Sequence, residues 1–142
     1  MTSGTSIFFH KEDIQFRFQN KEAIATWLNK VARKEKFRIS NLNYIFCSDQ
    51  YLLEINQEYL DHDTLTDIIT FDNSEEKNLI EGDIFISIDR VKENAIHFNR
   101  PFAEELRRVI VHGLLHLLGY KDKKPADQKK MRQMEDEALL LF

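Results

Sequence analysis

Strand-like and helix-like segments alternate along this chain, and their order constrains the fold more than any other feature. Five short runs rich in β-branched and aromatic residues predict strands, the last of them entered through Gly82. These runs are residues 6–10, 14–18, 38–47, 66–72 and 83–88. Because helical periodicity fills the segments between and after them, the sequence predicts an α+β fold, with a single layer of mixed β-sheet packed with helices.

Five helices are predicted from apolar residues at helical spacing and from residues that suit helix ends. Asn20, Ser48 and Asp89 stand where a side chain can cap a first turn. Pro101 suits the first turn of the fourth helix, and Gly119 suits its end. The predicted helices follow residues 20 and 48, the second ending near residue 60, and span 89–98, 101–119 and 125–141.

Length and composition favour one domain over residues 1–142. A chain of 142 residues with 42% hydrophobic and 11% aromatic residues can bury a substantial core. No internal repeat is present, and 4 Gly and 2 Pro leave no linker that would divide the chain.

The N-terminal segment and the single cysteine predict a cytoplasmic protein with no membrane partner. The opening MTSGTSIFFHKED lacks a basic stretch followed by an apolar run, and no segment approaches the roughly 18 consecutive apolar residues of a membrane span. Cys47, in the run LNYIFC, has no cysteine to pair with and is expected to be a buried strand residue in a reducing compartment.

The charge distribution is acidic overall but basic at one place. The net charge of −4 lacks the basic footprint of a simple nucleic-acid binder. A basic segment, defined here as residues 121–132, nevertheless carries six positive charges against the two negative charges of Asp122 and Asp127. Its basic residues are Lys121, Lys123, Lys124, Lys129, Lys130 and Arg132. Taken alone, this segment is explained more simply as a solvated loop and helix start, but it lies beside the predicted metal site.

Two histidines on the fourth predicted helix form the pattern most typical of a binding site. His112 and His116 are four residues apart, so their rings project from one helix face about one turn apart. Gly119 would then reverse the chain and bring Asp122 beneath them as a third ligand. The spacing H-x3-H-x2-G-x2-D matches that of metzincin-type zinc sites, with a carboxylate in place of the third His. The sequence therefore predicts one zinc ion per chain. Two buried core histidines are the structural alternative, and nickel, cobalt or manganese would also suit these ligands.

Three protein ligands predict a catalytic metal site, because a fourth position stays open for water. In metalloproteases of this pattern a glutamate base follows the first ligand, but Gly113 stands there in this chain. Phosphodiester chemistry, in which an RNA 2′-hydroxyl can itself be the nucleophile, is therefore favoured over peptide hydrolysis.

The segment HGLLHLLGYKD, preceded by TDIITFD and GDIFIS, resembles the YbeY family of bacterial ribosomal RNA maturation factors. The family signature HGxLHLxGYDH is reproduced at seven positions, which are His112, Gly113, Leu115, His116, Leu117, Gly119 and Tyr120. The resemblance implies a zinc-dependent, single-strand-specific endoribonuclease that matures the 3′ end of small-subunit rRNA and takes part in ribosome quality control. It also implies an α+β fold with the zinc helix against a mixed sheet. Its partners would be ribosomal RNA, the small subunit and proteins associated with the ribosome.

The chain departs from the family pattern at two positions. Asp122 replaces the third His, and zinc accepts carboxylate oxygen readily. Leu60 stands where the resemblance implies an Arg that contacts the substrate backbone. Arg108, on the face of His112, or Lys121 is the catalytic candidate for supplying that positive charge.

Other residues carry weaker hypotheses. His62 would lie in a loop beside the cleft, and Asp67 could hold a ligand His or a water. His10 and His97 lack a partner pattern. Two other functions stay open: a ribosome-assembly factor whose zinc is structural, and a zincin-like peptidase.

Overall fold

The computed structural model describes residues 6–60, the side chain of Leu60 excepted, and 66–142. One four-stranded sheet has the order β1-β2-β4-β3. Strands β1, β2 and β4 are parallel, and β3 runs antiparallel to β4. The strands are β1 (Ile7–Lys11), β2 (Arg38–Cys47), β3 (Ile68–Asp72) and β4 (Leu79–Ser87).

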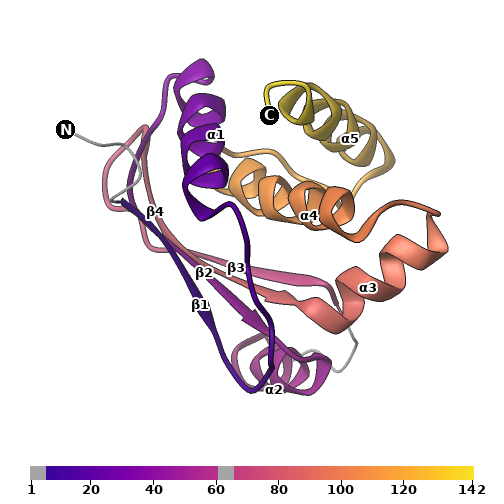
Figure 1. Cartoon of the computed structure of the whole chain (residues 1–142). Coiled ribbons are helices and arrows are strands. Elements are labelled where there is room, and N and C mark those ends of the chain that lie inside the picture. Colours follow the sequence, from indigo (N-terminus) through magenta and orange to yellow (C-terminus); the bar gives the residue numbers. More distant parts are fainter. Residues whose placement is uncertain (1–5, 61–65) are drawn as a thin grey trace.

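Five helices lie within the described residues, and they confirm the predicted α+β fold (Figure 1). Helices α1 and α4 lie on one face of the sheet, α5 lies beyond α4, and α2 lies near one end of the opposite face. The helices are α1 (Lys21–Lys34), α2 (Asp49–Leu60), α3 (Ile88–His97), α4 (Phe102–Leu117) and α5 (Pro125–Leu139). None of them is both long and apolar enough to cross a membrane.

The core between the sheet and α1, α4 and α5 is apolar, and two buried hydrogen bonds fix its layers. The Tyr44 hydroxyl of β2 donates to the Ile110 carbonyl of α4 at 2.8 Å. The Trp27 indole of α1 donates to the Ala138 carbonyl of α5 at 2.8 Å. Each donor is an otherwise apolar side chain whose polar tip finds a partner inside the core.

Cys47 is buried as predicted, and its burial raises the pKa of the thiol to about 12.

The predicted strand at 14–18 is wrong. These residues form an irregular connection from β1 to α1. Apolar and polar residues alternate here as in a strand. The rings of Phe16 and Phe18 both pack on Phe46 of β2, with centroid distances of 5.4 and 4.9 Å. Apolar contact with the core therefore explains the pattern without any strand pairing.

Three details of the helix and strand ends also differ from prediction. Ser87, the last residue of β4, caps α3 by accepting from the Arg90 amide, so Asp89 lies in the first turn instead. Asn20 occupies the N-cap position of α1 but has a left-handed backbone and makes no side-chain capping bond. The capping role of Ser48 is confirmed, because its hydroxyl accepts from the Tyr51 amide. Gly82 is an interior residue of β4, which begins at Leu79.

Helix α4 lies close against the sheet at Gly113. A Cβ atom added there would lie 2.9 Å from carbon atoms of Ile68 and Ile84, closer than real Cβ contacts allow. Position 113 therefore points into the core, and the distance between helix and sheet depends on the absence of a side chain.

Replacing Gly113 with Ala should destabilise the protein. Helix propensity alone predicts stabilisation by about 1 kcal/mol, whereas overpacking predicts a loss of about 1–3 kcal/mol. We expect the loss, measured as the free energy of unfolding in urea. The exposed Lys92→Ala substitution in α3 is the control and should change stability by less than about 0.5 kcal/mol. A more stable Gly113→Ala protein would contradict the close packing.

Candidate metal centre

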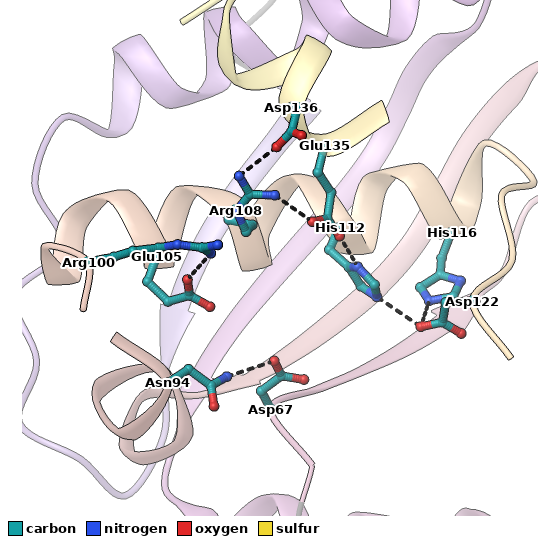
Figure 2. Close-up of polar contacts among 10 residues, drawn as sticks. All are labelled: Asp67, Asn94, Arg100, Glu105, Arg108, His112, His116, Asp122, Glu135 and Asp136. Carbon is teal, nitrogen blue, oxygen red and sulfur yellow. Dashed lines mark hydrogen bonds and ion pairs between the residues drawn. The ribbon is translucent and has the colours of Figure 1, made fainter. Parts of the chain in front are cut away.

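His112, His116 and Asp122 converge at the C-terminal end of α4, as the sequence predicts. The two imidazole rings lie with centroids 4.7 Å apart on one face of the helix. One carboxylate oxygen, Oδ2 of Asp122, lies 3.2 Å from Nε2 of His112 and 3.2 Å from Nε2 of His116 (Figure 2). The three potential ligand atoms all lie within 4.8 Å of one another, and no other such group occurs in the described part of the chain.

The turn at Gly119 brings Asp122 to the histidines. Gly119 has a φ of 108°, in the left-handed region that favours glycine. Its amide donates to the His116 carbonyl, and the Tyr120 amide donates to the Leu115 carbonyl, both at 3.0 Å. These bonds form a Schellman motif that ends the helix and reverses the chain. The Tyr120 hydroxyl then donates to Glu35 at 2.9 Å and fixes the turn against the end of α1.

This donor set fits a divalent metal ion. Two imidazole nitrogens and a carboxylate oxygen suit zinc and several other transition metals. The side chains of His112, His116 and Asp122 are 19, 25 and 36% exposed, so a small molecule or a substrate group can reach the site from solvent. The arrangement could hold one ion through three protein ligands.

Glu135 of α5 is a residue of the site that the sequence did not predict. Its Oε2 lies 2.5 Å from Nδ1 of His112, and its Oε1 accepts from Arg108 at 2.9 Å. Because an ionised carboxylate can only accept, Nδ1 of His112 must carry the proton, which leaves the lone pair of Nε2 facing Asp122 and His116. Burial lowers the pKa of His112, but the hydrogen bond and charge of Glu135 outweigh it and raise the pKa overall.

A sequence signal for Glu135 exists but is weak. Met131, Glu135 and Ala138 are the buried residues of α5, at helical spacing. A charged side chain on the buried face of an amphipathic helix needs a partner. The sequence does not identify that partner, because His112 lies in another helix.

The two candidate catalytic residues differ in their contacts. Arg108 points toward α5, where its terminal amino groups donate to Glu135 and, at 2.8 Å, to Asp136. Burial lowers the pKa of Arg108, but these carboxylates raise it further, so the guanidinium stays charged. Its Nε is buried without a hydrogen-bond partner. Lys121 is exposed, directly before Asp122.

The residues with weaker hypotheses can be placed in the same structure, except for one. Asp67 precedes β3 and accepts from Asn94 of α3 at 3.1 Å. Its burial raises the pKa of the carboxyl group, and the charge of nearby His112 lowers it in part. His10 bonds Asn43 on the sheet, and the His97 ring makes an edge-to-face contact with Phe98. His62 lies outside the described residues.

Comparison with known proteins identifies the family. The sequence model of the family described as Endoribonuclease YbeY matches residues 6–142. This chain belongs to the YbeY family. Two relatives named Endoribonuclease YbeY are similar over nearly their whole length. The relative from Cytophaga hutchinsonii is 59% identical over 136 residues, which cover 96% of this chain and 95% of that protein. The relative from Flavobacterium psychrophilum is 53% identical over 130 residues, which cover 92% of each protein.

A solved structure agrees with the YbeY fold described above. The solution structure of a Thermotoga maritima protein matches 95% of this chain and 87% of its own, with a TM-score of 0.67 and 29% sequence identity.

In this YbeY chain, Glu135 should strengthen metal binding by orienting His112. Loss of an outer carboxylate partner typically weakens metal affinity about 10–100-fold. We expect Glu135→Gln to weaken zinc binding within this range, measured by competition with a chromophoric chelator. The control is Glu137→Gln, a substitution in the same helix that leaves the contacts of His112 intact. Equal zinc affinities of Glu135→Gln and wild type would show that Glu135 does not orient the ligand.

Proposed function

We propose that this chain is a metal-dependent endoribonuclease that cleaves single-stranded RNA. The observation that carries the proposal is the convergence of His112, His116 and Asp122 in a partly exposed site, within a family whose relatives are named endoribonucleases. Zinc is the proposed ion, one per chain. When bound, it would supply Lewis-acid chemistry at a phosphodiester.

The protein's own residues orient this site. Glu135 holds the His112 ring, Arg108 holds Glu135, and the Gly119 turn holds Asp122. In this arrangement Arg108 acts through Glu135, because both of its terminal amino groups bind carboxylates. Lys121 remains the candidate for direct contact with a substrate phosphate, since its side chain is exposed beside Asp122.

A peptidase is disfavoured for a structural reason. The glutamate base of metalloproteases would occupy position 113, which points at Ile68 and Ile84 in the sheet. No side chain at this position could reach a substrate at the metal centre. Gly113 is therefore a packing residue, and it gives no support to the alternative of an assembly factor that has lost catalysis.

We extend the proposal to the substrate in the cell. The resemblance of HGLLHLLGYKD to the family signature supports maturation of the 3′ end of small-subunit rRNA, with a role in ribosome quality control. We propose accordingly that the protein acts in the cytoplasm, in contact with the small subunit and its associated proteins. Depletion should cause precursor rRNA with extended 3′ ends to accumulate, and a ligand-deficient variant should fail to correct it.

The metal and the activity should be lost together when the two histidines are removed. We expect one equivalent of zinc by elemental analysis and chelator-sensitive cleavage of single-stranded RNA for wild type, with both absent in a His112→Ala, His116→Ala double variant. A His10→Ala variant removes a histidine outside the site and should keep both.

Two results would contradict this function. Cleavage that persists in the ligand double variant would mean that the activity does not depend on this site. Bound zinc without any cleavage by wild type would favour the structural-zinc assembly factor.

The basic segment, residues 121–132, should bind the RNA backbone. Its six basic side chains are all exposed, and the segment begins at the metal centre. Removing one ionic interaction with a phosphate of a single strand should reduce the slope of log affinity against log salt by about 0.7. Replacing Lys123, Lys124 and Lys129 with Gln should therefore reduce this slope by up to about 2.

A matched triple variant tests whether position or only net charge matters. Lys30, Lys34 and Lys92 are exposed lysines on α1 and α3, so their replacement with Gln changes the net charge equally. Fluorescence anisotropy with a labelled single-stranded RNA should show wild-type salt dependence for this control. An equal reduction of the slope in both triple variants would refute a specific role for the basic segment.

A further inference from the structure

A small polar cavity lies beside the metal centre, and the function proposed above assigns no ligand to it. Its volume is about 130 Å³, and it is bounded by residues of α3, α4 and α5 and by Asp67. His112 forms one of its walls. Figure 2 shows Asp67, Asn94 and Glu105 on one side of His112, with His116 and Asp122 on the other. A group in the cavity would therefore adjoin a group at the metal centre.

The charged walls of the cavity are balanced and held in place. Three carboxylates face three guanidinium groups, which belong to Asp67, Glu105, Glu135, Arg100, Arg108 and Arg132. Asn94 donates to Asp67 at 3.1 Å, and Arg100 donates to Glu105 at 3.0 Å. A phosphate entering the cavity would meet these carboxylates, so a neutral group with hydrogen-bonding edges fits better than an anion.

An aromatic surface borders the cavity. Phe98 is 48% exposed, and the guanidinium carbon of Arg100 lies 5.1 Å from the centre of its ring. Flat aromatic and guanidinium surfaces are the features on which unpaired RNA bases stack.

We propose that this cavity receives one base of a single-stranded RNA, next to the phosphodiester at the metal centre. The inference rests on the proposed function for the position of the RNA. The volume is well below the roughly 300 Å³ at which pockets for drug-sized ligands begin, which limits the occupant to one base. Phe98 stacks on the base, and the carboxylates of Asp67 and Glu105 accept from its edge.

The acceptors of the cavity also set a base preference. Ionised carboxylates accept hydrogen bonds and cannot donate them. Adenine, cytosine and guanine carry an exocyclic amino group with two N–H donors, whereas the only N–H donor of uracil is its single ring N3–H. The cavity therefore favours amino-bearing bases over uracil.

Equilibrium binding of homopolymers tests the base site independently of cleavage. The probes are fluorescent oligo(A), oligo(C) and oligo(U) RNA and an abasic ribose-phosphate chain of the same length, in the presence of a chelator that prevents metal-dependent cleavage. Wild type should bind oligo(A) and oligo(C) about five-fold or more tightly than the abasic chain, and more tightly than oligo(U). Phe98→Ala should lose most of the advantage over the abasic chain, and Phe98→Trp should retain it.

Two further variants separate stacking from edge recognition. Phe8→Ala removes an exposed Phe of β1, outside the cavity, and should bind all probes as wild type does. Asp67→Asn replaces an acceptor with an amide that can also donate. This variant should reduce the difference in binding affinity between oligo(A) and oligo(U).

The outcomes distinguish this inference from the proposed function. The base site would be overturned if wild type bound the abasic chain as tightly as oligo(A). It would also be overturned if Phe98→Ala kept the full base advantage, which is the ratio of its affinities for oligo(A) and for the abasic chain. Equal affinity for oligo(U) and oligo(A) would overturn the role of the carboxylates. Absence of RNA cleavage after metal loading, with the base advantage intact, would count against the nuclease function alone.

Discussion

The close packing of α4 on the sheet is the constraint from which the arrangement of the site follows. Gly113 lets the helix backbone approach Ile68 and Ile84, and the Tyr44 hydroxyl bonds the Ile110 carbonyl from the same side. These contacts fix the rotation of the helix about its axis. Once position 113 faces the sheet, the histidines at 112 and 116 must lie together on the adjacent face of the helix, where both are partly exposed.

Helix α5 completes the site from the outer layer. It packs on α4 and carries Glu135, which is buried and bonded to both His112 and Arg108. A buried ion pair contributes little net stability compared with apolar packing, but removing one partner leaves a costly unpaired charge. The pair of Arg108 and Glu135 therefore specifies how α5 sits on α4 more than it strengthens the contact, and this position determines the orientation of the His112 ring.

The sequence predicted those parts of the structure that depend on short stretches of chain. His112, His116 and Asp122 were predicted because a helical turn and a glycine stop determine their relative positions locally. Glu135 was missed because its contact depends on how two helices pack. Residues 14–18 were predicted as a strand because their apolar residues alternate, yet the sequence does not show that Phe46 would provide the apolar contact. Ser87 was missed as a cap because β4 passes directly into α3 without a loop.

The local origin of the ligands has a consequence for folding. All three come from residues 112–122, so a bound ion closes only a short loop of the chain. Closing a short loop removes little conformational entropy from the unfolded chain. The sheet and its helices are meanwhile held by a core to which the ligands do not belong. The architecture is thus built without the metal, and loading of the ion can follow folding as a separate event.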